Sequence, residues 1–111
     1  MTTLLPKDSD NMAIPALRLK SDGAQQIDFT ATSARSLSAF DPTTRVISLY
    51  ATEPVYIRFG DSTISATDSD HYFPAGVYYD IAIGGGKTKQ HSHLAARAVS
   101  SSGVLYISEK E

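Results

Sequence analysis

Cysteine is absent from this 111-residue sequence, and its absence excludes several kinds of chemistry at once. Without thiols the chain forms no disulfide and no thiolate zinc site, and it has no cysteine nucleophile. Its stability therefore has to come from packing or from a partner.

Basic residues are few, and they are not gathered into one segment. Ten lysines and arginines oppose twelve acidic residues, which gives a formal net charge of −2. A protein that follows a phosphate backbone needs a basic stripe on its surface. We therefore expect no nucleic acid among its partners.

Long apolar runs are also missing. No stretch approaches the roughly 20 apolar residues of a membrane helix, so no membrane partner is expected. The first residues, MTTLLPKDSDNMAIPAL, lack a basic region followed by an unbroken apolar stretch, so no signal peptide is predicted. These features predict a protein that is made in the cytoplasm of a cell.

Helical periodicity is scarce, whereas the two-residue alternation of strands recurs along the chain. The best helical candidate, SARSLSAF at 33–40, is short and is followed by Asp41-Pro42. Segments that alternate, or that are rich in β-branched and aromatic residues, are 24–32, 45–52, 54–60, 76–83, 94–99 and 103–108, with a further strand within 12–20. We predict one all-β domain over residues 13–111, a β-sandwich that is jelly-roll-like, or else a small barrel, of about seven to eight short antiparallel strands. Residues 1–12 have no period and are predicted to form an extended N-terminal arm.

The alternation also predicts which side chains enter the core. In 24–32 it places Ile27, Phe29 and Ala31 on one side. In 54–60 the corresponding residues are Val55, Ile57 and Phe59, and in 76–83 they are Val77, Tyr79, Ile81 and Ile83. Tyr78 is predicted to lie on the opposite face of its strand.

The glycine-rich segment YDIAIGGGKTKQHSH (79–93) is similar to a phosphate-binding loop only in composition. That motif needs glycine, four residues and then Gly-Lys-Ser/Thr before a helix, but the position five before Gly86 is Ile81, within a strand. A dinucleotide fingerprint fails as well, because Lys89 occupies the position of the third glycine. The segment is predicted to be a turn between two strands, and no cofactor is expected.

Metal and catalytic sites receive little support. His91 and His93, joined by His71, form a weak candidate set for a metal-dependent enzyme. The aspartates of DSTISATDSD (61–70) lack the glycine and the distal glutamate of a calcium loop. No serine lies in a nucleophile elbow, and two of the three glutamates, Glu109 and Glu111, fall in a predicted C-terminal tail. We predict no catalytic residue and no metal ligand, and we do not expect an enzyme.

Aromatic residues, in contrast, are numerous and clustered. Tyr72, Phe73, Tyr78 and Tyr79 surround Pro74-Ala75-Gly76, and strand alternation requires some of these rings to reach the surface. Exposed aromatic rings favour a protein interface, although rings that only cap the ends of the sandwich remain an alternative. Apolar residues of the N-terminal segment could dock on a neighbouring surface in the same way. The candidate interface residues are Leu4, Leu5, Met12, Tyr72, Phe73 and Tyr78.

The order of these features matters more than any single one. SARSLSAFDPTTRVISLYATEPVYIRFGD is followed by a polar loop, by HYFPAGVYYDIAIGGG and by a terminal SSGVLYISE. Over residues 33–109 this order resembles a group of small virion-associated proteins of tailed bacteriophages. Those proteins share a strand ending in PVYIRFG, a polar loop, PAG with an aromatic strand, a glycine-rich turn and a last β-strand.

The resemblance implies a capsid decoration, or cement, protein on the virion surface, with the major capsid protein as its partner. Self-association, with a trimer favoured, would follow from the symmetry of the capsid lattice. The arm is not part of the shared pattern, so its use as a capsid clamp is a separate expectation. Three alternatives stay open: a head-tail or tail accessory component such as an adaptor or fibre base, a carbohydrate- or receptor-binding module built on Tyr72, Tyr78 and the aspartate-rich loop, and the metal-dependent enzyme.

Overall fold

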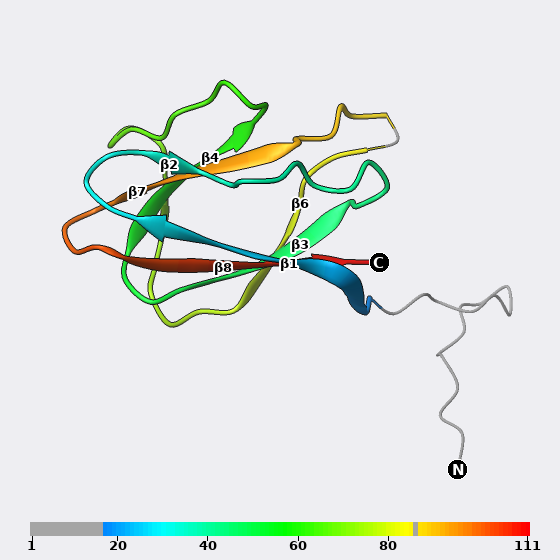
Figure 1. The fold of residues 1–111 in the computed structure, drawn as a ribbon, viewed down its shortest axis with the longest axis horizontal. Coiled ribbons are helices and arrows are strands. Elements are labelled where there is room, and N and C mark those ends of the chain that lie inside the picture. The colour runs from blue at the N-terminus through cyan, green and yellow to red at the C-terminus, as the bar shows by residue number, and fades with distance from the viewer. Residues whose placement is uncertain (1–16, 86) are drawn as a thin grey trace, which may run out of the picture.

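The computed structural model describes residues 17–85 and 87–111, which form an all-β sandwich (Figure 1). The strands are β1 (Leu19–Phe29), β2 (Ala34–Arg35), β3 (Val46–Ala51), β4 (Val55–Gly60), β5 (His71–Phe73), β6 (Tyr79–Ala82), β7 (His93–Ala98) and β8 (Gly103–Lys110). Within these residues no helix is long and apolar enough to cross a bilayer. The predicted all-β fold with about seven to eight strands is confirmed.

The connectivity is that of a jelly roll. One sheet has the order β1-β8-β3-β6 and the other has the order β2-β7-β4-β5, and all pairs are antiparallel. The pairs β1·β8, β2·β7, β3·β6 and β4·β5 show that the second half of the chain retraces the first, as in a folded ribbon that is wrapped into two sheets. The two sheets stay separate, so the chain forms the predicted sandwich and not a barrel.

The core lies between the two sheets and follows the predicted alternation in most strands. Ile27 and Phe29 are buried on β1, as expected, while Ala31 lies beyond the end of that strand and is exposed. In the centre of the same sheet Leu49 on β3 lies opposite Ile107 on β8, and both are fully buried. Apolar side chains on one face of each strand therefore specify the packing of the two sheets.

Two strands were not predicted, and two predicted boundaries need correction. Strands β2 and β5 are too short to show alternation, and pairing with β7 and β4 holds them in place. The strand expected at 76–83 begins only at Tyr79, because Gly76 adopts a positive φ of 77° in the preceding turn. Strand β8 continues to Lys110, so Glu109 is not in a tail but is buried.

The predicted arm, residues 1–12, and most of the strand expected within 12–20 lie outside the described residues. The described chain starts beside its own C-terminal end. Arg18 and Glu111 exchange two backbone hydrogen bonds, of 2.9 and 2.8 Å, and their side chains form an ion pair of 3.1 Å. Arg18 is therefore fixed just before the start of β1, which is one edge strand of its sheet.

The glycine-rich segment connects β6 with β7, as predicted. Gly84 and Gly85 have φ values of 96° and 118°, which L side chains rarely adopt. A Cβ atom at Gly84 would also lie 2.5 Å from the carbonyl oxygen of Lys89. The Gly85 amide donates a 2.6 Å hydrogen bond to the Thr88 carbonyl, which closes the turn.

Candidate functional site

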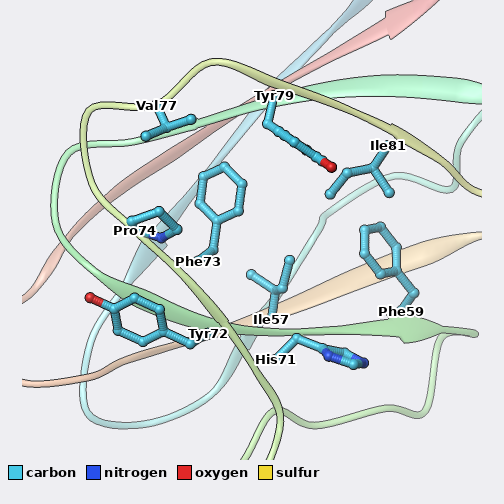
Figure 2. Close-up of a pocket in the computed structure, with 9 residues that line it drawn as sticks. All are labelled: Ile57, Phe59, His71, Tyr72, Phe73, Pro74, Val77, Tyr79 and Ile81. Carbon is cyan, nitrogen blue, oxygen red and sulfur yellow. The ribbon is translucent and has the colours of Figure 1, made fainter.

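One side of the sandwich is open, and an apolar groove runs along it (Figure 2). On the other side β1 lies against β2 and the two sheets meet. On this side the edge strands are β6 of the first sheet and β5 of the second. The groove between them has a volume of about 560 Å³.

The walls of the groove consist of side chains that point inward from both sheets. On the second sheet, His71 and Phe73 lie opposite Ile57 and Val55 of β4, in inward-facing positions. On the first sheet, Tyr79 and Ile81 lie opposite the buried Leu49 and Ile47 of β3. Figure 2 shows the side chains of Tyr79 and Ile81 across the groove from those of Phe73 and Phe59. The groove is thus an extension of the core that the two short edge strands do not close.

The two ends of the groove differ. At one end the segment 74–78 crosses from β5 to β6, and Pro74 and Val77 line the groove there. At the other end are Ile81 and Phe59, and the Phe59 ring packs on the His91 imidazole with 5.8 Å between centroids. This second end lies near Ala82, the last residue of β6, which pairs with Val46 at the start of β3.

The core prediction for the strand at 76–83 is only partly correct. Ile83 is fully buried and Ile81 is half-buried, but 56% of Tyr79 and 40% of Val77 are exposed. Tyr79 points inward from β6, and Val77 lines the groove from the preceding turn. No described side chain covers either of them from the solvent side. They form groove surface, not core.

The candidate interface residues do not all come together. Tyr72 is exposed at the rim of the groove, where its ring meets Tyr56 edge-on at 6.4 Å, and Phe73 is buried in the groove wall. Tyr78 is exposed but does not line the groove. Leu4, Leu5 and Met12 lie outside the described residues.

Tyr78 belongs instead to a polar cluster on the outer face of the first sheet. The Lys110 Nζ atom lies 5.3 Å from the centre of the Tyr78 ring and donates a 2.9 Å hydrogen bond to Asp80 Oδ1. The Ser48 hydroxyl, which is buried, donates to the same carboxylate. The hydrogen bond from Ser48, followed by that from Lys110, lowers the pKa of Asp80, and Asp80 in turn raises the pKa of Lys110.

The weaker candidate sites are dispersed or satisfied internally. Within residues 17–85 and 87–111, no three His, Asp or Glu side chains lie close enough to hold a metal ion. His71 lines the groove, and His93 Nδ1 is hydrogen-bonded to Ser92 Oγ at 2.9 Å. In the aspartate-rich loop, Asp61 and Asp70 accept hydrogen bonds from Thr63 and Thr67 of the same loop. The hydrogen bonds from the Thr63 hydroxyl and amide lower the pKa of Asp61.

Reasoning from the sequence missed that Ile57, Phe59, Val77, Tyr79 and Ile81 line a surface groove. Their alternation is identical to that of core residues, because they do point between the sheets. Which strands are edges follows from long-range pairing, and local periodicity does not encode it.

Comparisons of the chain with protein-family models, with curated proteins and with solved structures found no match.

Proposed function

We propose that this protein is a structural virion protein of a tailed bacteriophage, which decorates the outer face of the capsid and stabilises contacts between capsomers. The major capsid protein is its partner. The resemblance in the order of motifs over residues 33–109 is the reason for choosing this class. In the structure those motifs form β3, β4, β6 and β8 of the sandwich.

The exposed apolar groove is the observation that carries the proposal. Tyr72, Val77 and Tyr79 are 58%, 40% and 56% exposed and line the same groove at one edge of the sandwich. Apolar patches of this kind on a soluble domain mark interaction surfaces. Aromatic side chains provide large contact area at low entropic cost, so they are suited to anchoring a neighbouring protein.

The physical requirements of a cement protein are compatible with such a site. Many copies act on one shell, so a modest affinity per copy becomes a large avidity. Self-association as a trimer at three-fold positions would align three grooves with the lattice. The protein would then be located on the virion surface and would act without catalysis or a cofactor.

The copy number in purified particles tests this proposal against the head-tail alternative. Quantitative mass spectrometry relative to the major capsid protein should find on the order of hundreds of copies, as lattice decoration requires. A value of about 6 to 18 copies, as expected for rings at the head-tail junction or tail, would refute decoration.

Add-back to particles that lack the protein tests the site. Tyr72→Asp/Tyr79→Asp places two charges at the groove and should lower capsid occupancy at least tenfold, because buried charges are costly. The matched control is Tyr50→Asp/Tyr106→Asp, since this exposed cross-strand pair lies on the outer face of the first sheet, away from the groove. If the control loses occupancy and the groove variant does not, the capsid-binding surface is the outer sheet face.

A further inference from the structure

The outer face of the first sheet carries a second recess, at the edge where β1 pairs with β8. This recess, which we call the outer hollow, has a volume of about 360 Å³. Its lining consists of Ala24, Gln25, Gln26, Tyr106, Ile107 and Ser108. We propose that the outer hollow, together with the neighbouring Tyr50, binds a neutral saccharide. The site lies on a different surface from the groove and does not depend on a role in the virion.

Strand pairing explains the shape of the outer hollow. Ala24 on β1 lies opposite Ser108 on β8, and both side chains are small. Two residues further along β1, Gln26 lies opposite Tyr106, so a row of longer side chains stands next to a row of short ones. Tyr106 and Ser108 flank the buried Ile107, so they point away from the core. The short side chains form the floor of the hollow, and the Tyr106 ring borders it.

The aromatic surface continues from the outer hollow toward the middle of the sheet. Tyr106 lies opposite Tyr50 on β3, and the two residues are 46% and 39% exposed. The face of an aromatic ring carries a negative partial charge, on which C–H groups stack. A pyranose ring presents several C–H groups on one of its faces, so it can stack on Tyr106 and extend toward Tyr50.

Hydrogen-bonding groups lie beside these rings. Gln26 Nε2 donates a long hydrogen bond of 3.4 Å to Asp28 Oδ1, and both side chains are exposed. A carboxamide has two N–H donors and a carbonyl acceptor, so Gln26 retains capacity for a ligand hydroxyl. The Ser108 hydroxyl can both donate and accept. A ligand with C–H groups on its face and hydroxyl groups around its edge is complementary to this arrangement.

The charges on this face favour a neutral ligand. In the rows that cross the sheet at Ala24, Gln26 and Asp28, the outward acidic residues are Asp28 and Asp80. Lys110 is already paired, because its Nζ atom lies 2.9 Å from Asp80 Oδ1. These three rows therefore contain no free cation for a phosphate group or a sugar acid, and their charge disfavours a nucleic acid.

The size of the aromatic surface favours a small ligand over a second copy of the chain. At about 200 Å² per tyrosine, the exposed parts of Tyr50, Tyr78 and Tyr106 amount to about 300 Å². A stable dimer interface buries about 800 Å² on each partner. An apolar small molecule needs a pocket that encloses most of its surface, whereas a saccharide keeps its outer hydroxyl groups in water.

The outer hollow and the groove lie at opposite edges of the first sheet, because β1 is one edge strand and β6 is the other. A domain that contacts a capsomer through β5 and β6 keeps the β1 edge away from that contact. The saccharide site also differs from the one that the sequence suggested. Tyr78 lies on this face, where its ring contacts Lys110, but Tyr72 belongs to the second sheet.

Saturation-transfer NMR on the full chain tests the proposal. The probes are neutral oligosaccharides of glucose, mannose, galactose, xylose and N-acetylglucosamine at millimolar concentration, together with sialylated and sulfated oligosaccharides. Transfer to the ring C–H protons of at least one neutral probe is expected. No transfer to any neutral probe, or stronger binding of the acidic probes, would overturn the proposal.

Two substitutions of exposed tyrosines identify the surface that binds. Tyr106→Ala should weaken binding of the best neutral probe by about tenfold or more, because it removes the stacking surface. Tyr72→Ala is the matched control, since it removes an exposed tyrosine from the second sheet, and it should leave the affinity unchanged. Loss of binding in the control alone, or in both variants equally, would overturn the assignment to the outer hollow.

Amide chemical shifts locate the bound probe without any substitution and replace the variants if Tyr106→Ala fails to fold. The largest changes should fall in residues 24–26 and 106–108, and largest changes at the groove would contradict the proposal. Tyr50→Asp/Tyr106→Asp should lose saccharide binding but keep its capsid occupancy. Failure of saccharide binding is therefore distinguishable from failure of capsid decoration.

Discussion

At the scale of single residues, the buried carboxylate of Glu109 shows how one side chain fixes a loop. Its Oε1 atom accepts hydrogen bonds from the Asp41 amide at 2.8 Å and from the Thr44 hydroxyl at 2.7 Å. Gln90 donates to the carbonyl oxygens of the same two loop residues, at 2.7 Å each. The loop before β3 is therefore held to the end of β8 and to the segment before β7.

We expect Glu109→Ala to lower the free energy of unfolding by about 1–3 kcal/mol, because it leaves a buried hydroxyl and an amide without an acceptor. Glu109→Gln keeps an oxygen in the same place and should cost less than about 1 kcal/mol. Urea denaturation of both variants measures the difference. Equal costs would show that the charge, and not the acceptor, stabilises the loop.

The Asp80 carboxylate gives a pH-dependent contribution with a defined sign. Its pKa is lowered in the folded protein by Ser48 and Lys110, so its stabilising effect is present above its ordinary pKa of 3.8 and is lost as the pH falls through the lower folded value. Asp80→Asn should therefore destabilise the protein more at neutral pH than at about pH 2. Urea midpoints at both pH values test this.

Asp68→Asn, in the exposed loop 61–70, provides the matched control for that titration. It removes a carboxylate of the same type without touching the Ser48–Asp80–Lys110 cluster. If Asp80→Asn and Asp68→Asn change stability by the same amount at both pH values, the cluster makes no pH-dependent contribution.

At the scale of elements, the alternation of apolar and polar residues predicted the longer strands. Residues 45–52, 54–60, 94–99 and 103–108 correspond closely to β3, β4, β7 and β8. Strands β2 and β5 have two and three residues, and their existence depends on partners far away in the chain. The groove was not predicted for the same reason. Tyr79 has the alternation of a core residue, but only long-range pairing shows that its strand is an edge strand. Tyr72 was predicted only as a candidate interface residue of the aromatic cluster, and its exposure follows from its place on the outward side of β5, a strand that was not predicted.

The stability costs of two substitutions, one in the core and one in the groove, distinguish the two environments. Ile57 is 3% exposed, so Ile57→Ala should cost about 2–5 kcal/mol of unfolding free energy, as buried large-to-small changes do. Tyr79→Ala should cost less than Ile57→Ala, because more than half of its side chain is already in contact with solvent. Chemical denaturation of both variants measures this order, and the reverse order would contradict the assignment of Tyr79 to the groove surface.

At the scale of the whole molecule, the jelly roll leaves an apolar groove at one edge of the sandwich. The first sheet ends at β6 and the second at β5, and the groove between them collects aromatic side chains from both. In the proposed function this edge contacts the capsid, and the N-terminal arm is a second, separately testable contact.

Deletion of residues 1–11 should leave the sandwich folded, with an unchanged far-ultraviolet circular dichroism spectrum of the β type. Capsid occupancy in add-back should fall severalfold, because the apolar residues of the segment are lost from the contact surface. Unchanged occupancy would remove the segment from the capsid contact, while the groove would stay a candidate on its own.

A reconstruction of the virion at a resolution that shows strands is the most direct test of the proposed function. We expect density for the two-sheet sandwich on the outer face of the capsid, repeated over the lattice, with the edge formed by β5 and β6 facing a capsomer. Sandwich density only at the tail or at the head-tail junction, or a bare capsid surface in particles that contain the protein, would contradict capsid decoration.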